Sequence, residues 1–144
     1  MASCPSSILF VCSENALRSP MAEALAKADY GKKIFVDSVG VRDGVLDPMA
    51  VVVMDEIGID LSHHKPKRLD ELMDTSFEVI VTLSLQAQDM AVKLNSVNAS
   101  EVEYWPTPDP SLMEGNRNER LAGYRDLREY LTRCLKKRFA LHAL

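Results

Sequence analysis

Four short apolar runs along the chain alternate with segments whose apolar residues recur at helical spacing. The runs cover residues 7–11, 34–39, 77–83 and 101–105. Strands that alternate with helices are typical of βαβ units, in which parallel strands form one sheet and helices cover its faces. We therefore predict an α/β fold, a three-layer sandwich with a central four-stranded parallel sheet and about five helices.

The C-terminal part of the chain predicts one long amphipathic helix. Between residues 119 and 139 the apolar side chains recur at intervals of three and four positions: Leu121, Tyr124, Leu127, Leu131, Leu135 and Phe139. This spacing places them on one face of a helix and leaves an outer face rich in lysine and arginine.

A second helix is predicted over residues 49–57, although the local sequence gives mixed signals. Three consecutive valines at 51–53 favour a strand because they are β-branched. Asp47 and Pro48 in front of the segment, and Gly58 behind it, are typical of a helix start and a helix end. We interpret Asp47 as the N-cap of this helix, which is a structural role.

The composition predicts a single domain over residues 1–144. Hydrophobic residues make up 47% of the chain and charged residues 26%, which is ordinary for a soluble protein. The first apolar run lacks a basic segment before it and is too short for a signal sequence or a membrane span. A net charge of -4 argues against binding nucleic acid over a broad surface. We expect a cytoplasmic protein that binds neither nucleic acid nor membranes.

The strongest chemical signal follows the first predicted strand. The segment Cys12-Ser13-Glu14-Asn15-Ala16-Leu17-Arg18-Ser19-Pro20 indicates a tight loop that leads into a helix. We call residues 12–19 the Cys12 loop. Residues 13–17 contain no proline, so each can point its N–H group toward a phosphate, sulfate or arsenate ion at the positive end of the helix dipole. A thiol beneath such donors and beside the charge of Arg18 is a candidate nucleophile.

The other residues of the Cys12 loop suit an oxyanion substrate. The guanidinium of Arg18 matches two oxygens of a phosphoryl group, which predicts a role in binding both substrate and transition state. Asn15 tolerates left-handed backbone angles and can brace the loop through its side-chain amide. Ser19 is predicted to be the N-cap of the following helix, with Pro20 at the first helical position, and to donate to the Cys12 sulfur.

Asp109 is the predicted general acid. In parallel α/β sheets the loops beyond the carboxyl ends of the strands line one crevice, so the loops after the first and fourth strands can face each other. A cysteine that attacks a phosphomonoester needs an acid to protonate the leaving oxygen, and the same carboxylate can later activate water. The proline-rich segment 106–110 holds Asp109 in the second of these loops.

This pattern resembles the signature of the low-molecular-weight protein tyrosine phosphatase family, in which a cysteine, five residues, an arginine and a serine lie near the N-terminus. The resemblance continues through residues 20–24, 37–40, 58–62 and 105–110, so it spans nearly the whole chain. Several of these segments, and the Trp-Pro-Thr-Pro-Asp-Pro run, are similar to the arsenate-reductase branch of the fold. The resemblance implies a flavodoxin-like sheet of the phosphotyrosine phosphatase I type, with strand order 2-1-3-4.

The resemblance also implies which residues hold the asparagine of the loop. A serine at the end of the second strand corresponds to Ser38, and a histidine in a later loop corresponds to His64, with His63 as the alternative. No cysteine or carboxylate stands at ligand-like spacing near the two histidines, so neither a metal site nor a cofactor is predicted. The basic run 65–68 could rim the entrance for an anionic substrate, although a solvated surface is the preferred explanation.

Two positions in the Cys12 loop depart from the family pattern. Glu14 replaces the usual glycine, and Leu17 replaces a second cysteine. A carboxylate near the bound phosphate would repel it by about 1 kcal/mol in water and by about 4 kcal/mol near a protein surface, unless its side chain turns outward. Slow turnover or an unusual substrate is the expected consequence. Cys4 and Cys134 do not replace the missing thiol, so oxidised Cys12 is expected to recover poorly.

We expect hydrolysis of a phosphorylated protein, foremost phosphotyrosine, or of a small phosphomonoester, through a cysteinyl-phosphate intermediate. One alternative is arsenate reduction, which would need an external thiol or a glutaredoxin because residues 81–88 lack the further cysteines of thioredoxin-coupled members. Another is a phosphate- or phosphopeptide-binding module with weak catalysis. The loop after Asp109 lacks the tyrosines that stack on aromatic substrates in eukaryotic members, and Tyr104, Trp105 and Leu17 are the candidates to replace that apolar wall.

Overall fold

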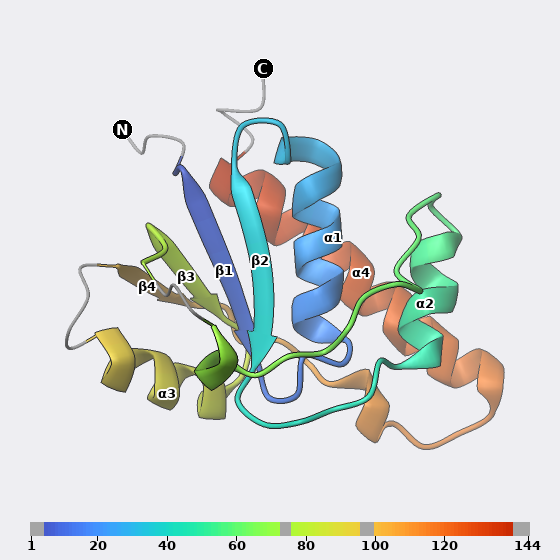
Figure 1. Ribbon diagram of the computed structural model, residues 1–144. Coiled ribbons are helices and arrows are strands. Elements are labelled where there is room, and N and C mark those ends of the chain that lie inside the picture. Colours follow the sequence, from blue (N-terminus) through green and yellow to red (C-terminus); the bar gives the residue numbers. More distant parts are fainter. Residues whose placement is uncertain (1–4, 73–75, 96–99, 140–144) are drawn as a thin grey trace.

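Strands and helices alternate along the chain (Figure 1). The computed structural model describes residues 5–72, 76–95 and 100–139. The strands are β1 (Ser7–Cys12), β2 (Phe35–Gly40), β3 (Val79–Thr82) and β4 (Glu101–Tyr104). The helices are α1 (Arg18–Tyr30), α2 (Pro48–Asp55), α3 (Leu85–Asn95) and α4 (Arg117–Phe139), with short 3-10 helices η1 (Leu69–Glu71) and η2 (Pro110–Leu112).

The four strands form one parallel sheet in the order β2-β1-β3-β4. Strand β1 lies inside the sheet because residues 8–11 are apolar and fully buried on both faces. Its register with β2 brings Cys12 opposite Gly40, and the register of β3 with β4 brings Thr82 opposite Tyr104. The carboxyl ends of the strands therefore meet at one edge of the sheet, the lower edge in Figure 1. The predicted parallel sheet and its strand order are confirmed.

Alternate residues of β1 supply two separate hydrophobic cores. Phe10 faces the core that contains side chains of α1, α2 and α4, including Met21 and Tyr124. Leu9 and its neighbour two positions on face the core beneath α3. Helices thus cover both faces of the sheet and produce the predicted three layers (Figure 1). Burial of one such large side chain contributes roughly 1.5–3 kcal/mol, so both faces fix the position of β1 and of the loop that follows it.

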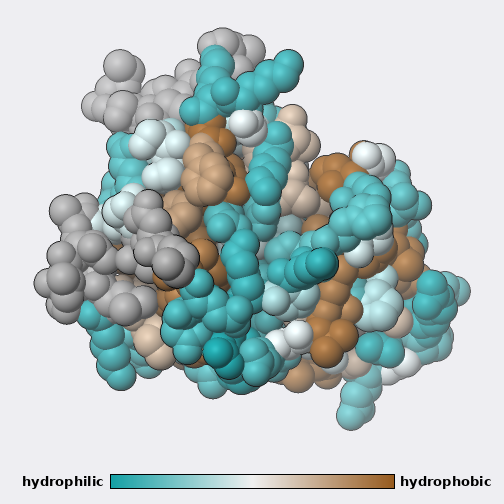
Figure 2. All heavy atoms as spheres, in the orientation of Figure 1, coloured by the Kyte–Doolittle hydropathy of each residue, from teal (hydrophilic) through white to brown (hydrophobic). Residues whose placement is uncertain are grey.

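Helix α2 packs against α4, and Figure 2 shows hydrophobic side chains gathered around it. The helix begins as predicted, because the Asp47 side chain accepts a hydrogen bond from Met49 N at 2.9 Å with proline at the first position. Just beyond its end, Glu56 accepts hydrogen bonds from Arg125 and Arg128 of α4, which lower the pKa of Glu56 to about 2. Within the described ranges no helix has the length and apolar character that crossing a membrane requires.

Candidate active site

Cys12 is the last residue of β1, and its side chain is buried at the carboxyl edge of the sheet. Its sulfur lies 2.8 Å from Ser19 Oγ and accepts a hydrogen bond from Asn15 N at 3.2 Å. The loop therefore curls around the sulfur and directs two hydrogen-bonding groups at it. Both groups can donate to a thiolate.

Ser19 does not cap α1, and this part of the prediction is wrong. Helix α1 starts at Arg18, the N-cap position is occupied by Leu17, and no side chain caps the helix there. The Ser19 hydroxyl instead accepts from Asn15 Nδ2 at 2.8 Å and contacts the Cys12 sulfur, so it faces the interior of the loop. These two contacts occupy the Ser19 hydroxyl, and it makes no capping hydrogen bond to the first N–H groups of α1.

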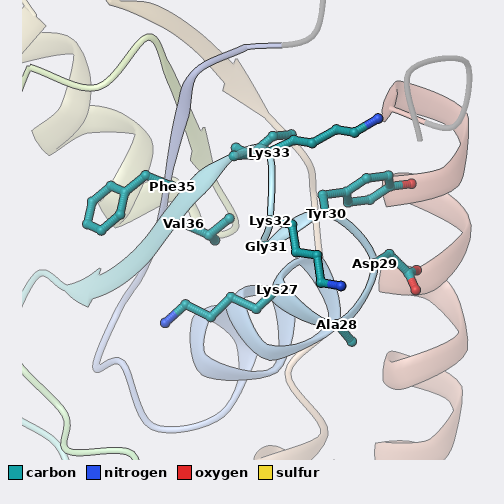
Figure 3. Close-up of a pocket in the computed structure, with 10 residues that line it drawn as sticks. Lys27, Ala28, Asp29, Tyr30, Gly31, Lys32, Lys33, Phe35 and Val36 are labelled. Atoms are coloured by element: carbon teal, nitrogen blue, oxygen red, sulfur yellow. The ribbon is translucent and has the colours of Figure 1, made fainter. Parts of the chain in front are cut away.

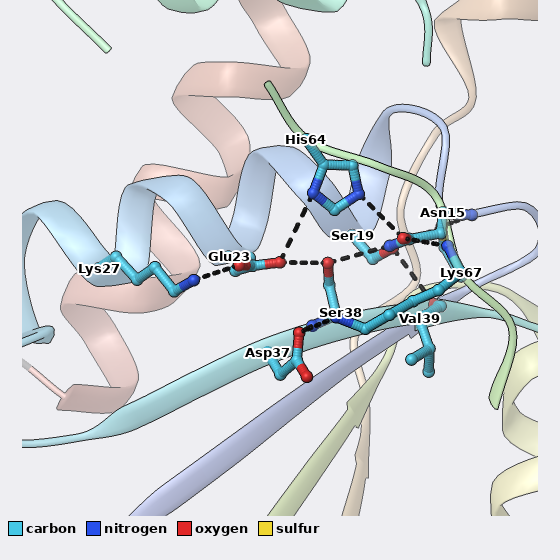
Figure 4. Close-up of polar contacts among 10 residues, drawn as sticks. Asn15, Ser19, Glu23, Lys27, Asp37, Ser38, Val39, His64 and Lys67 are labelled. Atoms are coloured by element: carbon cyan, nitrogen blue, oxygen red, sulfur yellow. Dashed lines mark hydrogen bonds and ion pairs between the residues drawn. The ribbon is translucent and has the colours of Figure 1, made fainter. Parts of the chain in front are cut away.

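Asn15 is fully buried and joins the loop to two other segments (Figure 4). It has a left-handed backbone, with φ of 56°. Its Nδ2 donates to Ser19 Oγ and, at 2.9 Å, to Ser38 Oγ at the end of β2. Its Oδ1 accepts from His64 Nε2 at 2.9 Å and from Lys67 N at 3.1 Å. Both the nitrogen and the oxygen of the side-chain amide thus have hydrogen-bond partners, which fixes the loop relative to β2 and to the segment that carries His64 and Lys67.

Of the two histidines, the structure brings His64 and not His63 to this network. The side chain of His63 is 90% exposed and contacts Asp60, whereas that of His64 is 12% exposed. Burial lowers the pKa of His64 and outweighs the attraction of Glu23, which acts in the opposite direction. The neutral ring donates to Asn15 through Nε2.

Glu23 of α1 completes the network and was missed from the sequence. Ser38 Oγ donates to Glu23 Oε1, the carboxylate pairs with Lys27, and His64 Nδ1 lies 3.9 Å from Oε1. A signal was present, because Glu23 interrupts a run in which residues 21, 22, 25 and 26 are apolar and buried. A buried carboxylate on such a face requires partners of its own.

Arg18 connects the Cys12 loop with the loops after β3 and β4. Its Nη1 donates to Thr107 O at 2.9 Å and to Leu83 O at 3.5 Å. Its Nη2 lies 3.9 Å from Asp109 Oδ2. Asp109 is itself fixed, because its Oδ1 accepts a hydrogen bond from Ser111 N at 3.0 Å and caps η2. The two carbonyl contacts hold the guanidinium in place through Nη1.

Cys12, Arg18 and Asp109 line one pocket of about 240 Å³. Ser13, Glu14, Ala16 and Leu17 of the Cys12 loop line it too, together with Arg42, Ser111 and Leu112. Of the three candidates for an apolar wall, Leu17 lies in this lining. Trp105 instead packs edge-on against the buried Phe10 ring, with the centroids 6.0 Å apart, and Tyr104 lies on the outer strand β4.

Glu14 is paired with Arg42 at the rim of this pocket. Arg42 Nη2 lies 3.1 Å from Glu14 Oε2, and the Glu14 side chain is 45% exposed. Neither Arg42 nor the backbone N–H of Lys67 was predicted to belong to the site. Nothing in its local sequence distinguishes Arg42. Lys67 lies in the basic run 65–68, which suggests an entrance rim and not a backbone donor to Asn15. Each residue reaches the site through the packing of the segments after β2 and α2.

A larger pocket, of about 610 Å³, lies at the opposite edge of the sheet (Figure 3). It is formed by residues 27–36, the end of α1 and the start of β2, and holds neither cysteine nor histidine. In the described part of the chain no group of three or more His, Cys, Asp or Glu side chains could hold a metal ion. Cys134 lies partly buried on α4, and Cys4 falls outside the described residues.

Comparisons with known proteins agree with this geometry. The family model of low molecular weight phosphotyrosine protein phosphatases matches residues 7–139. An arsenate reductase of Halalkalibacterium halodurans is 33% identical over 129 residues, which cover 90% of this chain and 91% of that protein. Among solved structures, a low molecular weight protein tyrosine phosphatase from T. tengcongensis has a TM-score of 0.79 and 26% identity, covering 94% of this chain and 98% of its own. An arsenate reductase in its phosphate-binding state has a TM-score of 0.74 and 25% identity over 94% and 98% of the two chains. The chain therefore belongs to the low molecular weight phosphotyrosine protein phosphatase family.

Proposed function

We propose that the protein hydrolyses phosphomonoesters through a cysteinyl-phosphate intermediate. The observation that carries the proposal is that the Cys12 sulfur, the Arg18 guanidinium and the Asp109 carboxylate line one pocket. A nucleophile, a fixed cation for the phosphoryl oxygens and a proton donor are the three groups that this reaction needs.

In the first step the Cys12 thiolate attacks phosphorus, an S–P bond forms and the P–O bond to the leaving group breaks. Asp109, protonated at the start, gives its proton to the departing oxygen. The N–H groups of the Cys12 loop and Arg18 bind the oxygens that carry the developing charge. Ser19 stabilises the sulfur before attack through its contact of 2.8 Å.

In the second step water attacks the phosphorus of cysteinyl phosphate. Asp109, now a carboxylate, takes a proton from the water, the S–P bond breaks, and inorganic phosphate leaves as the thiolate is restored. Arg18 binds the oxyanion in both steps, and the carbonyl groups of Leu83 and Thr107 keep its side chain in place. The cycle therefore needs no redox partner and no metal ion.

The walls of the pocket favour a substrate with a small or flexible leaving group. Leu17, Ser111 and Leu112 line it, and Leu112 is 79% exposed. Because the Trp105 ring is turned into the core, stacking on an aromatic substrate would have to come from elsewhere. We propose phosphorylated protein or a small phosphomonoester as substrate, with phosphotyrosine accepted through aliphatic contacts.

Arsenate reduction is the second candidate, because curated relatives that cover most of this chain carry that name. The Cys12 thiolate would displace one oxygen of arsenate as water and form an S–As bond. An external thiol would then attack the Cys12 sulfur, and the two electrons of the S–As bond would reduce arsenic as arsenite leaves. A second external thiol would reduce the mixed disulfide, since Cys12 and Cys134 are the free cysteines of the described residues and lie on different elements.

One set of assays separates the candidates. Wild type and Cys12→Ser are tested for phosphate release from an aryl phosphate, and in parallel for arsenite formation with glutathione and glutaredoxin. Binding of inorganic phosphate to the wild type is measured by titration calorimetry. Phosphate release that is lost in Cys12→Ser supports the hydrolase. Arsenite formation without phosphate release would favour the reductase, and tight phosphate binding without either activity would favour a binding module. Phosphate release that persists in Cys12→Ser would exclude Cys12 as the nucleophile.

A further inference from the structure

The ion pair between Arg42 and Glu14 lies at the rim of the pocket that contains Cys12. Arg42 Nη2 is 3.1 Å from Glu14 Oε2, and Arg42 Nε donates to the same oxygen at 3.2 Å. The remaining Nη1 donates to Gln86 Oε1 on α3. The guanidinium of Arg42 therefore bridges the Glu14 carboxylate of the Cys12 loop and the neutral Gln86 side chain of α3.

The backbone of the segment after β2 fixes Arg42 relative to the Cys12 loop. Arg42 N donates to Ser13 O at 2.9 Å, and Val41 N donates to the same oxygen at 2.9 Å. A Cβ atom at Gly44 would lie 2.6 Å from Glu14 O and 2.7 Å from Glu14 Cβ, so glycine permits the close approach of the two segments. Arg42 is thus held beside Glu14 by contacts that do not depend on the ion pair itself.

When both carboxylates are ionised, the formal charges that line the pocket cancel only because Arg42 is present. Glu14, Asp109, Arg18 and Arg42 are the residues of the lining with formal charge, two acidic and two basic. Without Arg42 the lining would carry a net negative charge before the thiolate is counted. A phosphate dianion would then approach an uncompensated carboxylate in the loop that binds it.

We propose that Arg42 is a positioning residue that neutralises Glu14 and so permits the Cys12 loop to hold a phosphate dianion. This inference rests on the proposed function in one respect, namely that the oxyanion occupies the Cys12 loop. Arg42 is not proposed to contact the reacting atoms. Arg42 acts on affinity through Glu14, and the pair compensates for the carboxylate that this chain carries in place of glycine.

Binding of inorganic phosphate to the full chain, measured by titration calorimetry, tests the proposal without requiring turnover. Arg42→Ala is expected to weaken phosphate binding by about tenfold at low salt, with a smaller effect at high salt, because the pair is half exposed and screened. Arg42→Ala combined with Glu14→Gln is expected to bind phosphate within about twofold of wild type, because the repelling charge is gone. Arg42→Lys retains the charge and is expected to stay close to wild type.

Arg125→Ala is the matched control. It removes an exposed arginine of α4 that is paired with the Glu56 carboxylate and does not line the pocket of Cys12. It should leave phosphate affinity unchanged. Unchanged affinity in Arg42→Ala would overturn the inference, as would a double variant that binds phosphate as weakly as Arg42→Ala alone. If the wild type fails to bind phosphate, the proposed function fails together with the inference, whereas normal binding that ignores Arg42 overturns the inference alone.

Discussion

The side-chain amide of Asn15 donates a hydrogen bond to Ser38 Oγ at 2.9 Å, which joins the Cys12 loop to the end of β2 across 23 positions of sequence. Ser38 in turn donates to Glu23 of α1. The loop is therefore anchored to both elements that follow it, the helix and the next strand. Because these donors and acceptors are buried, removing one leaves others without a partner, at a cost of about 1–3 kcal/mol for each buried group.

Substitution of Asn15 separates the effect of the backbone from that of the side chain. Asn15→Gly keeps the left-handed conformation but loses the amide contacts, whereas Asn15→Ala loses both. We expect both variants to turn over an aryl phosphate more slowly, and the alanine variant to be less stable than the glycine variant by about 1–2 kcal/mol. Urea unfolding measures the difference. Equal stability of the two would mean that the loop relaxes to another backbone conformation.

The strands and the Cys12 loop could be predicted because their signals are local. Each buried strand is a run of apolar residues, and the predicted run 34–39 overlaps β2, which covers Phe35–Gly40. Asp47 was correctly predicted as a cap because the residue after it is proline, which marks the first helical position. Patterns of this kind involve residues that are adjacent in the sequence, so they can be recognised before the fold is known.

The remaining parts of the site depend on contacts between distant segments. The carbonyl groups of Thr107 and Leu83 hold Arg18, and any residue would supply a carbonyl there. Arg42 and Lys67 are surface-type residues whose positions follow from the path of loops. The predicted cap at Ser19 was wrong because its hydroxyl contacts Cys12 and Asn15 and not the N–H groups at the start of the helix.

Gly123 of α4 packs against the end of the Met113 side chain, just after η2. A Cβ atom at this position would lie 2.2 Å from Met113 Sδ and 3.5 Å from Pro110 Cβ. The close atoms belong to the end of a flexible side chain that is 42% exposed, so in Gly123→Ala we expect Met113 to turn aside while η2 and Asp109 stay in place, and we expect activity to change by less than about twofold. The measurement is kcat for an aryl phosphate. The helix itself is not weakened, because alanine has the higher helix propensity.

Met113→Ala in the Gly123→Ala background provides the control. Removal of the sulfur makes room for the new methyl group, so both variants should match wild type in kcat. A slow Gly123→Ala whose kcat recovers in the double variant would contradict this expectation and would show that the contact with Met113 positions Asp109.

The buried His64 makes stability depend on pH. Its pKa is lowered in the folded protein by burial, so the unfolded chain binds the proton more readily. The contribution of His64 to the free energy of unfolding is fully present above about pH 6.5, the ordinary pKa of histidine. That contribution is lost as the pH falls from this value through the lower pKa of the folded state. Urea unfolding of wild type between pH 8 and pH 5 should therefore show a falling free energy of unfolding.

His64→Gln and His63→Gln form a matched pair for this effect. The His64 variant should lose the part of the pH dependence that belongs to the imidazole, while the His63 variant should keep it, because that side chain is 90% exposed. If the two variants gave the same pH profile, the titration of His64 would not be coupled to folding.

Asp109 is expected to matter most when the leaving group is poor. A general acid speeds proton transfer by about 10²- to 10⁴-fold, and an alkoxide needs that proton more than a nitrophenolate does. Asp109→Asn should therefore reduce hydrolysis of an alkyl phosphate far more than hydrolysis of nitrophenyl phosphate. Asp47→Asn is the matched control, because Asp47 also precedes a proline and caps a helix. Its loss should lower stability without changing the dependence on the leaving group, and an equal loss on both substrates in Asp109→Asn would remove Asp109 from the acid role.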